Sequence, residues 1–182
     1  EIIQKLTNEE FCKFLTIKDK KCMNVFHNLA KTCKSTRVFA YSKIKKVYEN
    51  VNNLKEFLLL KDGENEASAL LLSILYDNEI SFLYLFEKIY CVVFKLKEFI
   101  YEVDDEDEHI FHNLARYGSL PMLESFTAQL ITQLSREEMI ELLKLKSIFN
   151  DNIFHMTACN TDSISINFLI DFSENLLTQD PV

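Results

Sequence analysis

The sequence predicts an all-α fold, a helical repeat solenoid of about four units. A hydrophobic-Phe-His motif recurs at residues 25–30, 110–115 and 153–158. Its histidines are separated by 85 and 43 residues, and because 85 is close to twice 43, the spacing predicts a further copy near residue 70. The chain is 48% hydrophobic but has only 2 Gly and 2 Pro, which favours helices joined by polar turns over a β-sandwich or a Rossmann-type sheet.

The motif is expected to join successive units of the stack. Its residues are Phe26, His27, Ala30, Phe111, His112, Ala115, Gly118, Phe154, His155 and Ala158. Near residue 70 the hydrophobic spine persists, but Leu70 and Leu71 stand where the other copies have the Phe-His pair. No chemistry shared by all four units can therefore depend on the imidazole.

Each unit is expected to begin with two helices. The first, short helix follows the motif at 25–33, 67–76, 110–117 and 153–160, and the second, amphipathic helix covers 36–50, 79–94, 119–132 and 163–177. Ser119 and Ser163 are predicted to cap two of the second helices, with Pro121 in a first turn where its missing N–H costs little.

A third helical segment leads into the next unit. Thr7 with Glu10, and Ser135 with Glu138, form capping boxes that predict helix starts. In the middle units the tetrad Leu-Lys-Glu-Phe occurs at 54–57 and again 42 residues later at 96–99, which supports the period independently.

The period predicts one repeat domain over residues 1–182. It consists of a leading helix over 1–19 and units at 20–61, 62–103, 104–147 and 148–182. The polar segments 18–21, 62–66, 104–108 and 150–152 recur in register, so we expect them to be exposed turns on one edge of the stack. The chain opens at Glu1 without a Met, which suggests a fragment excised from a longer protein.

The net charge of −8 is unevenly distributed. Residues 1–50 carry 11 basic and 5 acidic side chains, and residues 51–182 carry 9 and 23. The acidic body argues against nucleic-acid binding, and the most apolar stretch, 80–100, is too charged to insert into a membrane. The five consecutive acidic residues at 104–108 would favour a partner with a basic surface, unless they form only a solvated loop. The residues expected to bind the partner are Lys20, Lys21, Glu64, Glu66, Asp104, Asp105, Glu106, Asp107 and Asp151.

The order of a polar turn, a hydrophobic-His-x-x-Ala helix and a second helix resembles the ankyrin repeat. The copy with Phe111, His112, Ala115 and Gly118 is the closest match, and the resemblance covers about residues 18–178. It implies histidines that tie neighbouring turns together, and a protein-binding module of the kind found in viral or bacterial effectors and in inhibitors of NF-kappa-B-type factors. The period of about 43 rather than 33, and the missing Thr-Pro, also fit armadillo or HEAT repeats.

Catalysis and metal binding are not expected. Equivalent histidines on successive helices lie too far apart to share a zinc ion, and the sequence has no nucleophile elbow, phosphate-binding glycine loop or calcium loop. No cofactor is expected. The competing function is that of a structural or oligomerising spacer within a larger protein.

The five cysteines are an odd number without a Cys-x-x-Cys pair, and most are expected to be buried as small hydrophobic residues. We therefore expect an intracellular location, cytoplasmic or nuclear, or the host cytosol for an effector.

Overall fold

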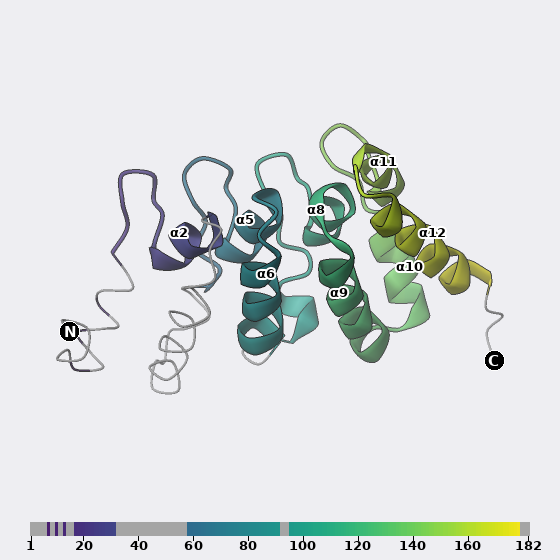
Figure 1. The fold of residues 1–182 in the computed structure, drawn as a ribbon, viewed down its shortest axis with the longest axis horizontal. Coiled ribbons are helices and arrows are strands. Elements are labelled where there is room, and N and C mark those ends of the chain that lie inside the picture. Colours follow the sequence, from purple (N-terminus) through teal and green to yellow (C-terminus); the bar gives the residue numbers. More distant parts are fainter. Residues whose placement is uncertain are drawn as a thin grey trace. The chain divides into compact units, whose positions relative to one another are not determined.

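The computed structural model describes residues 7, 10, 13, 17–31, 58–91 and 95–178. These ranges contain eight α-helices, one π-helical segment and one 3-10 turn, with a single β-bridge between Val103 and His109 and no strand (Figure 1). The all-α prediction is confirmed. The helix expected over 36–50 and the tetrad at 54–57 lie outside the described residues.

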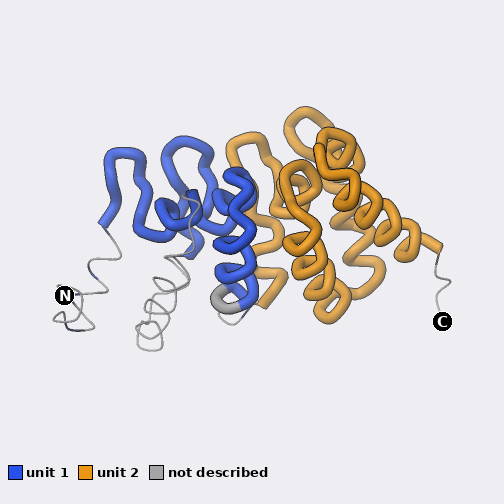
Figure 2. The backbone as a smooth tube through the Cα atoms, in the orientation of Figure 1, with its two compact units in different colours: residues 1–94 blue, residues 95–182 orange. Residues whose placement is uncertain are grey.

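The chain divides into two compact units, 1–94 and 95–182 (Figure 2). In the amino-terminal unit, α2 packs against α5, and α5 against α6. The bounds are α2 Val25–Lys31, α5 Ala69–Leu75, α6 Glu79–Leu85 and the π-helical η2 Phe86–Tyr90. Phe26, Leu70, Phe82, Phe86 and Tyr90 form its core, and the Tyr90 hydroxyl donates a hydrogen bond to the Leu58 carbonyl. Phe86 and Tyr90 are thus core residues, whereas Tyr84 is only half-buried.

The carboxy-terminal unit contains one 3-10 turn and five α-helices. Their bounds are η3 Leu96–Glu98, α8 Ile110–Tyr117, α9 Leu120–Gln133, α10 Arg136–Lys144, α11 Ile153–Cys159 and α12 Ser163–Thr178. The helix α8 packs mainly on α11, and α12 packs on α9 and α10. Phe111 lies at the centre, with ring centroids 5.3 Å from Phe126 and 6.4 Å from Phe172.

The predicted capping boxes are present. Ser135 N donates to Glu138 Oε2 (3.0 Å), and Glu138 N donates to Ser135 Oγ (3.2 Å). Thr7 and Glu10 make the same pair of bonds at 2.9 and 3.3 Å. Ser119 is the N-cap of α9, with Pro121 in the first turn. Each box satisfies backbone donors that the helix itself leaves open.

Three local expectations were wrong. Asp162, not Ser163, caps α12, because its carboxylate accepts from Ile164 N at 3.1 Å and Ser165 N at 3.3 Å while Ser163 is already helical. The tetrad at 96–99 forms one 3-10 turn rather than a long helix, since the chain enters the bridge at Val103 a few residues later.

The third wrong expectation concerns the cysteines. Cys22 and Cys159 are exposed and Cys91 is half-buried, because Cys22 lies in a turn and Cys159 ends a short helix. Over the described ranges, no helix combines the length and apolarity needed to cross a membrane.

Candidate interaction surface: the polar turns

Four turns precede the short helices, and they share one backbone geometry. We name them turn 1 (17–24), turn 2 (60–68), turn 3 (102–109) and turn 4 (145–152). Each is closed by a backbone bond from an N–H to a carbonyl four or five residues ahead. These bonds are Asp19 N to Met23 O, Asp62 N to Ala67 O, Asp104 N to Glu108 O and Ser147 N to Asp151 O, at 2.9 to 3.2 Å. Each turn also has one residue with positive φ: Cys22, Glu66, Asp107 and Asn150.

An aspartate at the start of turns 1 to 3 holds the backbone in place. Asp19 Oδ1 accepts from Lys21 N and Met23 N, and Asp104 Oδ1 accepts from Glu106 N and Glu108 N, all at 2.8 to 3.0 Å. Asp62 does the same across a turn one residue longer, bonding Asn65 N and Ala67 N. Turn 4 starts with Ser147, whose hydroxyl accepts from Phe149 N. Such side-chain-to-backbone bonds fix a turn before any partner arrives.

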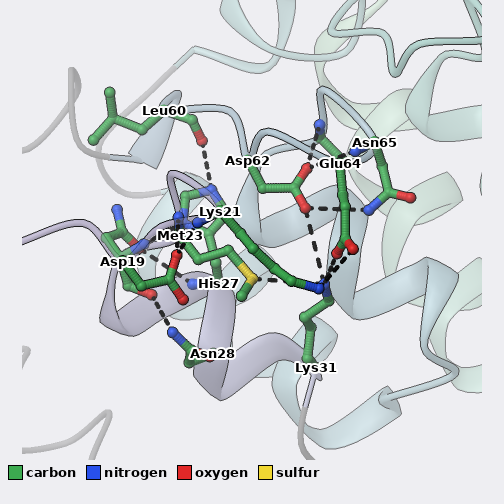
Figure 3. A network of polar contacts seen from close by, with 12 residues as sticks. Asp19, Lys21, Met23, His27, Asn28, Lys31, Leu60, Asp62, Glu64 and Asn65 are labelled. Carbon is green, nitrogen blue, oxygen red and sulfur yellow. Dashed lines mark hydrogen bonds and ion pairs between the residues drawn. The ribbon is translucent and has the colours of Figure 1, made fainter.

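The histidines tie each turn to the one that follows within the same compact unit. His27 Nε2 lies 2.8 Å from the carbonyl of Leu60, the first residue of turn 2 (Figure 3). His112 Nε2 lies 3.0 Å from the carbonyl of Leu145, the first residue of turn 4. A carbonyl only accepts, so Nε2 carries the proton in both rings. These two histidines thus tie neighbouring turns together by hydrogen bonds.

Burial keeps these imidazoles neutral. It lowers the pKa of both His27 and His112, although the accepting carbonyl and the nearby Asp62 or Asp104 partly oppose the shift. The second nitrogen is also engaged, since His112 Nδ1 accepts from His109 N at 3.2 Å. Both ring nitrogens therefore serve the backbone. Among the described residues, no three His, Cys, Asp or Glu side chains are grouped to hold a metal ion.

A backbone bond also joins neighbouring turn tips. Gly63 N donates to Lys21 O (2.8 Å), and Ile148 N donates to Glu106 O (3.2 Å). The donor and the acceptor occupy the same places in both pairs of turns. A Cβ on Gly63 would lie 3.2 Å from Lys21 O, a tight approach that the glycine avoids.

In turns 1 and 2 the predicted partner-binding residues are partly paired with one another. Lys21 Nζ lies 2.6 Å from Glu64 Oε1, and Lys31 Nζ lies 3.2 Å from the other oxygen (Figure 3). Lys21 first, and then Lys31, lowers the pKa of Glu64. Lys20 and Glu66 are exposed. This pairing leaves less unbalanced charge than the sequence suggested.

Turn 3 divides its five carboxylates between the interior and solvent. Asp104 and Glu108 are buried, Glu106 is half-buried, and Asp105 and Asp107 are exposed. Asp104 Oδ2 accepts from Asn113 Nδ2 at 2.8 Å. The run is therefore not a uniformly solvated loop. Asp104 is first of all a structural residue, and Asp105 and Asp107 remain for a partner.

Arg116 is the counter-charge to the buried side of turn 3, and the sequence did not single it out. Its guanidinium lies 2.8 Å from Glu108 Oε1 and 3.7 Å from Glu106 Oε2. The Glu108 contact lacks hydrogen-bond geometry, so the pair is an electrostatic contact only. Burial outweighs Arg116 and, with Asp104 and Glu106 nearby, raises the pKa of Glu108 to about 7.

Turn 4 is apolar at its tip. Asp151 is half-buried, and its carbonyl closes the turn. Ile148 and Phe149 are 55% and 61% exposed. Sequence analysis overlooked both, although two large apolar residues beside Asn150 in a predicted polar turn were a visible signal.

The motif residues are buried in three copies and uncovered in the fourth. Phe26, Ala30, Phe111 and Ala115 are buried, and Leu71, which takes the place of the histidine in α5, is fully buried. Phe154, His155 and Ala158 on α11 are exposed. Gly118 ends α8, where a Cβ would lie 2.5 Å from the Leu114 carbonyl.

The sequence was compared with family models and with curated proteins. No family model matches the chain, and no curated protein matches it closely enough to count as a relative.

Proposed function

We propose that the chain is a protein-binding module, an ankyrin-like helical repeat solenoid that recognises a basic surface on a partner protein through its turns and first helices. One observation carries the proposal. Turn 3 is fixed from within by Asp104 and presents Asp105 and Asp107 to solvent. A turn held in this way loses little conformational entropy on binding, which favours affinity.

The recurrence of the turns supports a repeat architecture. The backbone bond that closes each turn and the residue with positive φ recur at matching positions in all four turns. The backbone bond between neighbouring turn tips recurs in both pairs of turns. A binding role also fits the histidines better than catalysis or metal binding does. The ring nitrogens of His112 are both committed to backbone groups, so its imidazole has no lone pair or proton available for a substrate.

An aromatic residue beside turn 3 could anchor the partner. Tyr101 is exposed, and its ring packs edge-on against His109, with 6.3 Å between the centroids. Partly fixed, exposed tyrosines are frequent anchors of protein interfaces. We propose that Tyr101 supplies apolar contact while Asp105 and Asp107 meet basic side chains.

The test is an array of short basic peptides, followed by kinetics on the strongest binder. The variant Asp105→Asn with Asp107→Asn should lose several-fold in association rate, with a loss that shrinks as salt is raised. Tyr101→Ala should mainly accelerate dissociation.

The matched control removes two exposed carboxylates elsewhere in the same unit, through Glu124→Gln with Glu141→Gln. The control should bind as the parent does. Equal losses in both double variants would show that only net charge matters, and unchanged binding in both would remove turn 3 from the proposal.

A further inference from the structure

The helix α11 carries the same motif as α2 and α8, but the side that bears Phe154 and His155 is left exposed by the described residues. Phe26 and Phe111 are each 1% exposed, whereas Phe154, at the same motif position, is 42% exposed. His27 and His112 are fully buried, but His155 is exposed. Phe154, His155, Ile148 and Phe149 together form what we call the tail face.

The covered copies show what this face is built to receive. His112 donates to the carbonyl of Leu145, two residues before Ser147 in the next turn. The tip carbonyl of Glu106 accepts from Ile148 N in that next turn. The ring of Phe111 lies against Phe172 of the following helix pair. His27 and Lys21 O make the equivalent bonds to Leu60 O and Gly63 N.

The tail face offers the same donor and acceptor. His155 Nδ1 accepts from Asn152 N at 3.3 Å, as His112 Nδ1 does from His109 N. His155 Nδ1 also lies 2.7 Å from Asn152 Oδ1, as His27 Nδ1 does from Asn24 Oδ1. Because His27 donates from Nε2 in this same arrangement, the local geometry of His155 is compatible with donation from Nε2 as well. The Phe149 carbonyl occupies the place of Lys21 O and Glu106 O. The side chains of Ile148, Phe149 and Phe154 make this face apolar, and exposed apolar patches mark sites of interaction.

Turn 1 has the groups that would complete these bonds. Leu60 and Leu145 lie two residues before Asp62 and Ser147. The residue two before Asp19 is Ile17, so its carbonyl is the matching acceptor in turn 1. The Ile17 side chain is 63% exposed. The N–H that matches Gly63 N and Ile148 N belongs to Lys20. We call the exposed part of turn 1, residues 17–21, the head face.

The segments that carry the two faces have opposite net charges. Residues 17–31 carry Lys18, Lys20, Lys21 and Lys31 against the single Asp19. Residues 147–178 carry Asp151, Asp162, Asp171 and Glu174 and have no Lys or Arg. Opposite charges steer two such surfaces together and disfavour like-to-like pairing.

We propose that the tail face binds the head face of a second copy of this chain. The copies then associate head to tail through the same two hydrogen bonds that join turns within each unit. His155 Nε2 donates to the Ile17 carbonyl of the second copy, and its Lys20 N–H donates to the Phe149 carbonyl. This inference goes beyond the proposed function, which uses Asp105, Asp107 and Tyr101. A head-to-tail contact leaves one head and one tail open, so association continues past the dimer.

The test is sedimentation velocity of the whole chain over a wide range of concentration and at two salt concentrations. The weight-average mass should rise with concentration, and less so in high salt. Phe154→Asp blocks the tail and Ile17→Asp blocks the head, and each should be monomeric. Both sites are exposed, so circular dichroism should show both variants folded. Ile131→Asp, an equally exposed isoleucine on α9, should associate as the parent does.

Mixing the two blocked variants gives the decisive result. Each then has one competent face, so the mixture should form a dimer and nothing larger. A parent that stays monomeric at every concentration overturns the proposal. Association of the Ile17→Asp variant alone also overturns it, because it would show tail-to-tail pairing. A loss of association in the Ile131→Asp variant would overturn it as well, since the tail face would then not be specific.

Discussion

At the scale of single residues, burial decides what each histidine of the repeated motif does. His27 and His112 are fully buried and neutral, and each donates to a carbonyl 33 residues further along the chain. His155 has the same local bond to the residue three before it but is exposed. The same motif therefore gives two buried structural histidines and one exposed histidine.

This difference predicts unequal effects of the same substitution. His112→Ala should lower the free energy of unfolding by about 2–4 kcal/mol, because it leaves a cavity and removes the partner of the Leu145 carbonyl. His155→Ala should cost less than about 1 kcal/mol, since only a local bond at the start of α11 is lost. Urea unfolding of both variants measures the two values. Equal losses in the free energy of unfolding would contradict the role of His112 in joining two turns.

Glu108 gives a prediction on pH. Its pKa is about 7 in the fold against 4.5 in a free side chain, because it is buried. Between these values the unfolded chain releases the proton first, so this group makes stability fall as pH rises from about 4.5 to about 7. Glu108→Gln should therefore stabilise the protein at pH 8, by on the order of 3 kcal/mol at most. The gain should vanish below pH 4.5.

The control for Glu108 is Asp105→Asn in the same turn, where the side chain is exposed and no such gain is expected. Unfolding curves at several pH values compare the variants with the parent. A difference between Glu108→Gln and the parent that does not change with pH would refute burial as the cause.

At the scale of elements, two adjacent residues, Asp162 and Ser163, are candidates for the N-cap of α12. Asp162 accepts from two backbone N–H groups and from the Ser165 hydroxyl, and the Ser165 bond lowers its pKa most. Asp162→Ala should cost about 1 kcal/mol of stability. Ser163→Ala, one residue later, should be close to neutral. Thermal unfolding distinguishes them, and a larger loss in Ser163→Ala would restore the assignment made from sequence.

The elements also show how far sequence reasoning reached. Helix positions and the Ser135 box followed from local periodicity and capping chemistry, which act over a few residues and can be read directly. The split of turn 3 into buried Asp104 and exposed Asp105 could not be read in this way. Asp104 is held by a hydrogen bond from Asn113, which lies nine residues further along the chain. The cover over Phe111 comes from Phe172, 61 residues further on, and no local pattern encodes it.

At the scale of the whole molecule, the described part of each compact unit contains one hydrogen bond from a motif histidine to a main-chain carbonyl. His27 to Leu60 lies within residues 1–94, and His112 to Leu145 lies within residues 95–182. In α5 the position that matches these histidines is Leu71, whose side chain cannot donate a hydrogen bond.

This arrangement predicts that the two units lose stability separately. Native-state hydrogen exchange of the full chain should show that His112→Ala lowers protection over 95–178 and leaves 58–91 unchanged, because the broken bond belongs to one cooperative unit. His27→Ala should lower protection over 17–31 and 58–91 only. The two variants are each other's control, since both remove a buried imidazole bonded to a main-chain carbonyl. A uniform loss of protection in either variant would instead show that the whole chain opens as one cooperative unit.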